Sequence, residues 1–416
     1  MRKYLLVGLA VVLAATTGVL IYQGSTGGSN AASGVDVTVT QTTTVGGGDP
    51  AASSPGSSDA GSSSGSAGSS SPAGPPPPPV EGRAATNVPM TKLAPGEQAP
   101  QFIIFSFDGA GSHTKWQEFT AAAQPTNSRI NGFLTGLYLL ADENKNAYTG
   151  PGHSPGKSSV GFGGTTEEIA TLINDLNQAY AAGHEIGTHY NGHFCAGSEP
   201  SGNNWTTADW SNELEQFFGF LENYRANNPG ADLPELNVPA EAIKGGRTQC
   251  LEGTLEQLIP AWKQAGLTYD SSMPAPAKGV YWPQKVDGIW EFYMPFVYSP
   301  AFEGSVMLMD YNMWIKFNKG ENQPETAPQL RQIVYDTYTH LYDETSNGNR
   351  APLLIANHFN NWNGNSFNEP TLRFMTDYCG KPNTYCATYQ DVIAWMEMQD
   401  PAVLQQLLDQ APVAAA

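Results

Sequence analysis

Short, nearly continuous apolar runs that end at polar residues constrain the fold of this chain more than any other feature. Residues 101–107 (QFIIFSF) and 352–357 (PLLIAN) are such runs, and Asp108 and His358 follow them directly. Apolar runs of this length are typical of strands that are buried on both faces of a parallel sheet or barrel. We therefore expect two buried strands, each with a titratable side chain at its carboxyl end.

Amphipathic helical patterns separate these apolar runs. Helices are predicted at 165–182, 253–266 and 327–343, and further strand-like segments lie at 132–140 and 267–271. Strands that alternate with helices, with polar residues at the carboxyl ends of the strands, predict an α/β barrel or a doubly wound sheet.

The amino terminus has the composition of an export segment. Arg2 and Lys3 precede an apolar run that extends to Tyr22. Such a segment is typical of a signal peptide, and it is also just long enough to span a bilayer. We expect residues 1–23 to be a retained membrane anchor or a cleaved signal peptide, with a buried core helix as the third alternative. The protein is then secreted or held at the outer face of the membrane.

Residues 24–96 are rich in Gly, Ser, Ala, Thr and Pro and are predicted to be a disordered linker. This leaves a single catalytic-type domain at 97–405 and a tail at 406–416. Only the segment 1–23 is expected to contact a membrane.

The folded part of the chain is strongly acidic. The net charge of −19 lies entirely in residues 97–416, because basic and acidic residues balance in the first 96. A surface of this sign repels phosphate backbones, so nucleic acid is excluded as an expected partner. No feature indicates a partner protein, and we expect a monomer.

Four cysteines in an exported chain favour two disulfides. Cys379 and Cys386 enclose a short loop and are expected to pair, which leaves Cys195 with Cys250. The alternative is four free thiols.

His189 and His193 are four residues apart. On a helical turn, residues at this spacing share one face and can bind one metal ion. The pair alone is a weak signal, because two of seven histidines will sometimes fall at this spacing by chance.

Four further polar residues are candidates for chemistry: Asp108, Arg247, Asp270 and His358. Taken singly, each has a structural explanation, as a helix cap, a surface ion pair, a turn former and a buried core histidine, respectively. Their order along the chain gives them a second interpretation.

In this order, the candidates and the segments around them resemble the five motifs of the polysaccharide deacetylases, carbohydrate esterase family four. The resemblance covers approximately residues 101–401 and is closest to the branch that contains animal chitin deacetylases. It is carried by residues 107–110 (FDGA), 183–186 (GHEI), 269–272 (YDSS), 281–283 (YWP), 350–352 (RAP) and 392–395 (VIAW).

The resemblance implies a distorted (β/α) barrel with a divalent metal ion, expected to be zinc, at the carboxyl ends of the strands. His189 and His193 match the metal ligands of the family. Asp108 matches the general base, and Arg247 matches the arginine that orients this base.

The resemblance also implies the remaining roles and the reaction. His358 matches the general acid, Asp270 fits the carboxylate that orients it, and the main-chain N–H of Cys250 matches a donor of the oxyanion hole. The implied reaction removes N-acetyl groups from a cell-wall or extracellular polysaccharide such as chitin or peptidoglycan. Three tryptophans are candidates for lining a sugar groove: Trp282, Trp314 and Trp362.

The sequence departs from the family at one ligand. The family has two consecutive aspartates, of which the second completes the metal site, and here Gly109 takes the second position. Either Asp108 becomes the ligand, or His113 or a neighbour supplies it, or the site binds no metal. In the last case the chain is a catalytically impaired relative that binds glycan.

Overall fold

The computed structural model describes residues 83–94 and 96–414. The segment 1–23 and residues 24–82 of the expected linker lie outside the described residues. Within the described part, no helix is long and apolar enough to cross a membrane.

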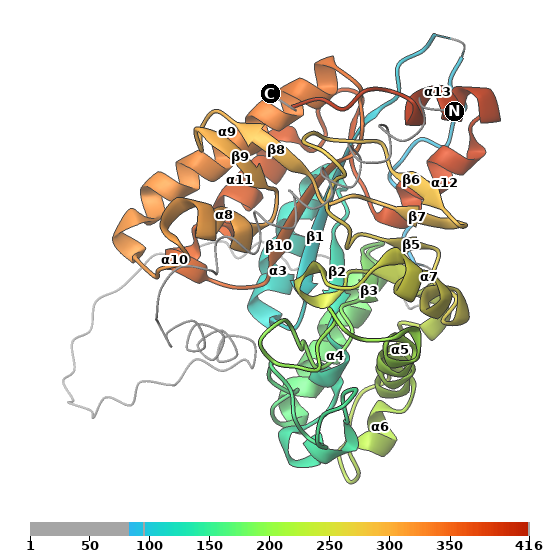
Figure 1. Ribbon diagram of the computed structural model, residues 1–416, viewed down its shortest axis with the longest axis vertical. Helices are drawn as coiled ribbons and strands as arrows, with labels where there is room; N and C mark the ends of the chain where they lie inside the picture. The colour runs from blue at the N-terminus through green and yellow to red at the C-terminus, as the bar shows by residue number, and fades with distance from the viewer. Residues whose placement is uncertain (1–82, 95, 415–416) are drawn as a thin grey trace, which may run out of the picture.

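A nine-stranded, mostly parallel sheet forms the centre of the domain (Figure 1). Its strands are β1 (Gln101–Gly109), β2 (Asn131–Leu134), β3 (Glu185–Thr188), β4 (Gly245–Gly246), β5 (Tyr269–Asp270), β6 (Gln284–Val286), β7 (Ile289–Glu291), β10 (Leu353–His358) and β11 (Thr384–Cys386). Their order is β10-β1-β2-β3-β4-β5-β7-β6, and β11 pairs with the first residues of β1. A separate hairpin contains β8 (Phe296–Ser299) and β9 (Gly304–Met307).

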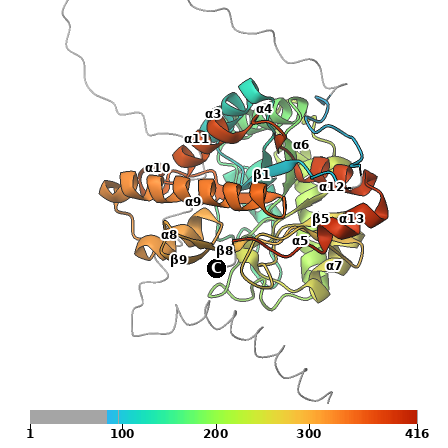
Figure 2. The same ribbon diagram turned by 90° about the horizontal axis from the view of Figure 1, so that it is seen from above.

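Helices pack around the sheet (Figure 2). They are α3 (His113–Ala123), α4 (Thr166–Ala181), α5 (Thr207–Glu222), α6 (Tyr224–Asn227), α7 (Leu255–Gln264), α8 (Asp310–Asn318), α9 (Ala327–Asn347), α10 (Trp362–Asn365), α11 (Asn368–Tyr378), α12 (Tyr389–Met398) and α13 (Pro401–Leu408). Helix α9 packs on α11, α11 packs on α3, and α3 packs on α4, while α5 packs on α7. The apolar strands β1 and β10 are buried between these layers.

The α/β class predicted from the sequence is confirmed, but the barrel is not closed by continuous ladders among the described strands. β10 lies at one end of the sheet and β6 at the other. The β8–β9 hairpin follows β7 in the chain, and just beyond its end an isolated bridge joins Met309 to Ala356 of β10. An antiparallel hairpin therefore stands where a closed barrel would have a further strand–helix unit.

One predicted strand is shorter than expected. The strand predicted at 132–140 ends at Leu134, and residues Gly136–Leu139 form a 3₁₀ turn. The N–H of Gly136 donates to the carbonyl of Tyr190 at 2.8 Å. The chain leaves the sheet here because its backbone bonds to the loop that carries the two histidines.

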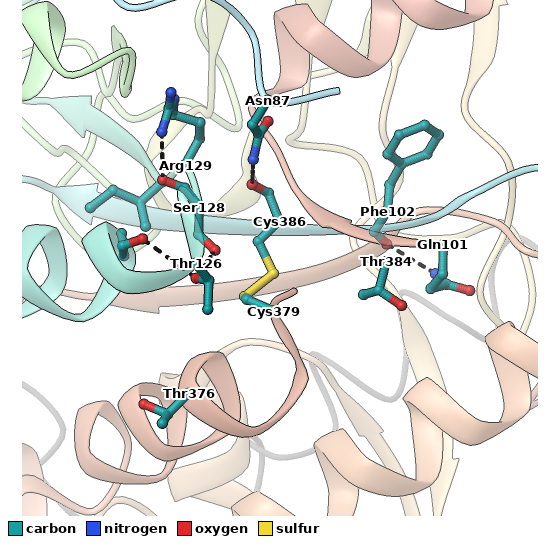
Figure 3. Close-up of a disulfide and its surroundings, with 12 residues drawn as sticks. Asn87, Gln101, Phe102, Thr126, Ser128, Arg129, Thr376, Cys379, Thr384 and Cys386 are labelled. Carbon is teal, nitrogen blue, oxygen red and sulfur yellow. Dashed lines mark hydrogen bonds between the residues drawn. A yellow bond between two sulfur atoms is a disulfide. The ribbon is translucent and has the colours of Figure 1, made fainter. Parts of the chain in front are cut away.

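The folded domain extends beyond the expected limits of 97 and 405 at both ends. Val88 is buried, and the Asn87 side chain donates to the carbonyl of Cys386 at 2.8 Å (Figure 3). At the other end, Val413 forms a bridge with Val280. At the amino-terminal end, the Gly-, Ser-, Ala-, Thr- and Pro-rich composition extends past Val88, so the sequence did not indicate where packing begins.

Both expected disulfides are present. Cys379 at the end of α11 is bonded to Cys386 of β11 (Figure 3). Cys195 is bonded to Cys250, which joins the loop after β3 to the loop after β4. The second bond lies beside the candidate site.

The narrow spacing around β4 gives the first testable prediction. A Cβ atom on Gly246 would lie 1.9 Å from the carbonyl oxygen of Thr188 in β3, which cannot move without breaking the sheet. We expect Gly246→Ala to lower the free energy of unfolding by at least about 2 kcal/mol. Gly219 lies inside α5 with no described atom within 4 Å of such a Cβ, so Gly219→Ala is expected to raise it by about 1 kcal/mol. Urea unfolding measures both, and effects of the same sign would contradict this packing.

Candidate active site

The candidate residues lie at the carboxyl ends of neighbouring strands. Asp108 is in β1 and His358 ends β10, and the two residues are directly opposite in the parallel ladder. His189 follows β3, and Arg247 follows β4. Because the carboxyl ends of parallel strands meet at one edge, side chains from four strands converge here.

Asp108 and Arg247 form a buried ion pair. The Nη1 group of Arg247 donates to Oδ1 of Asp108 at 2.7 Å, and their residues are 0% and 3% exposed, respectively. Further bonds satisfy the guanidinium: Nη2 donates to the hydroxyls of Ser106, Ser271 and Tyr389, and Nε donates to the carbonyl of Ser271. A buried charge is tolerated when it is paired and hydrogen-bonded in this way.

The surroundings keep Asp108 ionised. Burial alone raises the pKa of its carboxyl, because desolvation disfavours the charged form. The positive charge of Arg247, with smaller contributions from His358 and from the hydrogen bond of Arg247, outweighs burial and holds the pKa below its ordinary value. Asp108 is therefore a carboxylate at neutral pH.

The partner of His358 is Asp310, which corrects the expectation that Asp270 orients this histidine. Nδ1 of His358 lies 2.8 Å from Oδ1 of Asp310, and the His358 backbone N–H donates to Oδ2 at 2.7 Å. Asp310 begins α8 directly after Met309, whose bridge to Ala356 brings this segment alongside β10. In the sequence, Asp310 follows the apolar run 306–309, but this local pattern does not indicate which histidine the aspartate contacts.

Asp310 raises the pKa of His358. Burial alone lowers the pKa of this imidazole, but the charge of Asp310 and the hydrogen bond to it outweigh burial. The pKa of His358 therefore lies above its ordinary value, and its side chain is 24% exposed. A proton on this ring is both retained and accessible.

Asp270 contacts the site indirectly, through Ser272. Its carboxylate accepts bonds from the N–H and the hydroxyl of Ser272, and the hydroxyl of Ser272 accepts the N–H of Thr248 at 2.8 Å. Burial raises the pKa of Asp270 to about 6. Asp270 thus steadies the segment that follows Arg247.

The segment from His189 to His193 is a loop and not the helical turn that the spacing predicted. Tyr190 and His193 have φ angles of 54° and 53°, which end any helical path. The Asn191 side chain donates to the carbonyl of Glu213 at 2.7 Å. The loop still brings the two imidazoles together, with ring centroids 5.3 Å apart.

Both imidazoles are suited to be neutral ligands. Nδ1 of His189 lies 2.9 Å from the carbonyl of Arg247, and because a carbonyl only accepts, this nitrogen carries the proton. Nε2 of His189 is buried without a hydrogen-bond partner among the described residues. Burial lowers the pKa of both rings, with that of His193 at about 3. An unpartnered, unprotonated ring nitrogen fixed by a bond on its other side is the usual arrangement of a metal-binding histidine.

His113 and Asp108, the two named candidates for a third ligand, differ in their surroundings. His113 is bonded to Asp175 of α4 at 2.8 Å, so its ring is occupied away from the pair. Arg247 bonds Oδ1 of Asp108, and Oδ2 of this carboxylate accepts no hydrogen bond among the described residues. The neutral rings of His189 and His193 fit a divalent ion, and Oδ2 of Asp108 is free to join them.

One of the three tryptophans lies at the site. The ring centroid of Trp362 is 4.9 Å from that of His358, and Trp362 is half-buried. Trp314 is buried and stacks on Trp362 from behind. Trp282 is a core residue whose indole N–H donates to the carbonyl of Asn349.

Comparisons with known proteins found structural likeness only. No family model matches the chain, and no curated protein is significantly similar to it. A Mycobacterium smegmatis structure described as a polysaccharide deacetylase has a TM-score of 0.44 and 13% identity, covering 79% of this chain and 98% of that one. A family 4 carbohydrate esterase from Streptomyces lividans has a TM-score of 0.35 and 13% identity, and the match covers 70% of this chain and 92% of that one. The chitin deacetylase from Colletotrichum lindemuthianum has a TM-score of 0.32 and 11% identity, and the match covers 80% of this chain and 98% of that one. At TM-scores below 0.5, these likenesses establish no detail of this chain's activity.

The partner of His358 is testable without any assay of activity. We expect Asp310→Asn to lower the pKa of His358 by about one unit or more, because the neutral amide no longer stabilises the imidazolium. Asp270→Asn is the matched control and should leave this pKa in place. NMR titration of the histidine ring protons measures both, and the reverse result would restore Asp270 as the partner.

Proposed function

We propose that this protein is a metal-dependent hydrolase that removes N-acetyl groups from a cell-wall or extracellular polysaccharide of the chitin or peptidoglycan type. The observation that carries the proposal is the pair Asp108 and His358. They are opposite each other in adjacent strands, and their pKa values are shifted in opposite directions. Titratable neighbours whose pKa values are driven apart are the usual sign of a general base and a general acid.

Asp108 is proposed as the general base. It is ionised at neutral pH, and Arg247 fixes one of its carboxylate oxygens. An oriented carboxylate can take a proton from the water that attacks an amide carbonyl. Arg247 is proposed to act through Asp108 by orientation, and not by contact with the substrate.

His358 is proposed as the general acid. Its raised pKa keeps a proton available, and the bond to Asp310 places this partner on Nδ1, so that Nε2 is the nitrogen left to face a substrate. The proton would go to the nitrogen of the departing sugar amine. The main-chain N–H of Cys250 is proposed to stabilise the negative oxygen that forms when water attacks.

His189 and His193 are proposed to hold the divalent ion, which we expect to be zinc. When bound, such an ion supplies a Lewis acid for the amide carbonyl. The two neutral rings contribute no negative charge, and Asp108 is the carboxylate whose charge acts on both of them.

The glycan class rests on the surface beside the acid. Trp362 offers a half-buried ring next to His358, and an aromatic face of this kind stacks on apolar faces of sugar rings. The net charge of −19 disfavours a polyanionic glycan. Two disulfides agree with a location outside the cytoplasm, so we propose an exported monomer.

Release of acetate from N-acetylchitooligosaccharides by the full-length protein with added zinc tests the proposed function. We expect His358→Ala and Asp108→Asn each to lower kcat by about 10² or more, because each removes one proton transfer. A chelator is expected to abolish the activity, and zinc to restore it.

His113→Ala is the matched control, because His113 is a half-exposed histidine bonded to Asp175 outside the site. This variant should keep full activity, with an unchanged circular dichroism spectrum. Glycan binding without acetate release from either chitin or peptidoglycan fragments would contradict the enzyme and indicate a glycan-binding relative.

A further inference from the structure

The disulfide between Cys195 and Cys250 lies directly against a proposed metal ligand. Nδ1 of His193 is 3.5 Å from Sγ of Cys195. One ligand atom from each of His193, Cys195 and Cys250 falls within 4.8 Å of the others, and this is the one such group among the described residues. Two cysteines and a histidine are a common zinc ligand set when the sulfurs are thiolates.

The group is open to the solvent. Cys250 is exposed, while His193 and Cys195 are half-buried. The Cα atoms of the cysteines are 6.0 Å apart; Cys195 is on a loop, and Cys250 is in the short 3₁₀ turn Gln249–Leu251. A reductant and a metal ion can therefore reach the sulfurs, and the thiolates can separate without movement of the sheet.

We propose that reduction of the Cys195–Cys250 disulfide creates a second metal site, in which Cys195, Cys250 and His193 bind a thiophilic divalent cation such as zinc. A dithiol reductant supplies two electrons and two protons, so the S–S bond breaks, two thiols form, and the reductant becomes a disulfide. The cation then displaces the two thiol protons and binds both thiolates together with Nδ1 of His193.

The two sites share one imidazole. A neutral histidine has one unprotonated ring nitrogen, so binding through Nδ1 leaves the proton on Nε2. In the oxidised protein, Nδ1 of His193 faces the disulfide and Nε2 is the nitrogen available to pair with His189. Metal binding by the reduced site thus withdraws His193 from the pair. This consequence for activity rests on the proposed function, whereas the site itself does not.

The chain contains its own control for a disulfide that should not become such a site. Cys379–Cys386 lies between the end of α11 and β11, and the side chains around it in Figure 3 include no histidine. Its cysteines belong to no ligand group among the described residues.

Cobalt(II) binding to the full-length protein tests the proposal. Protein reduced with a dithiol, and freed of it by gel filtration without oxygen, is titrated with cobalt beside the oxidised protein. We expect thiolate-to-cobalt charge-transfer absorption in the reduced protein only. It should persist in the double variant Cys379→Ser/Cys386→Ser and be lost in Cys195→Ser/Cys250→Ser. Equal spectra before and after reduction would overturn the proposal.

Thiol labelling of the wild-type protein tests the same proposal if a double variant fails to fold. In reduced wild-type protein, zinc is expected to slow alkylation of Cys195 and Cys250 at least about tenfold and to leave Cys379 and Cys386 unchanged, as mass spectrometry of peptides would show. Equal protection of all four would overturn the proposal. A positive cobalt or labelling result without any acetate release would refute the proposed function and leave this site standing. If acetate is released, the zinc-loaded reduced protein should be about tenfold less active than the zinc-loaded oxidised protein.

Discussion

The buried ion pair of Asp108 and Arg247 is the interaction on which the site depends. The guanidinium bonds to β1 through Asp108 and Ser106, to the residue after β5 through Ser271, and to α12 through Tyr389. Removing either charge would leave the other buried without a partner, which typically costs about 3–5 kcal/mol. The same residue also fixes the first histidine of the pair, because the carbonyl of Arg247 accepts the ring N–H of His189. One arginine therefore sets the charge of the proposed base and the tautomer of a proposed ligand.

The parallel sheet places a second titratable side chain opposite Asp108. The ladder between β1 and β10 places His358 opposite Asp108. Asp310, which follows the β8–β9 hairpin in the chain, bonds to Nδ1 of His358 and stabilises its protonated form. Gly109, at a φ of 83°, follows Asp108 and offers no side-chain ligand. The proposed acid and base thus lie opposite each other on adjacent strands, while the two proposed metal ligands of the loop after β3 are neutral imidazoles.

Local patterns predicted the features of the fold that local physics determines. The apolar runs before Asp108 and His358 form β1 and β10 as predicted, and the short spacing of Cys379 and Cys386 correctly predicted their disulfide. Asp310 was not predictable in this way, because its partnership with His358 depends on a bridge between segments 47 residues apart in the chain. The loop form of the histidine pair was missed for a similar reason. Its positive φ angles are held by tertiary contacts, such as the bond from Asn191 to Glu213, that no spacing rule contains.

Asp108 is the proposed base and His358 the proposed acid, and the pH dependence of kcat/KM for acetate release measures both roles in the free enzyme. The base must be ionised, so activity should fall only as the pH drops below the lowered pKa of Asp108, under its ordinary value of 3.8. The acid must be protonated, so activity should be lost as the pH rises through the raised pKa of His358, above its ordinary value of 6.5. The expected result is a bell-shaped pH profile of kcat/KM with these two limbs. An activity that keeps rising into alkaline solution, or an alkaline limb below 6.5, would contradict the assignment.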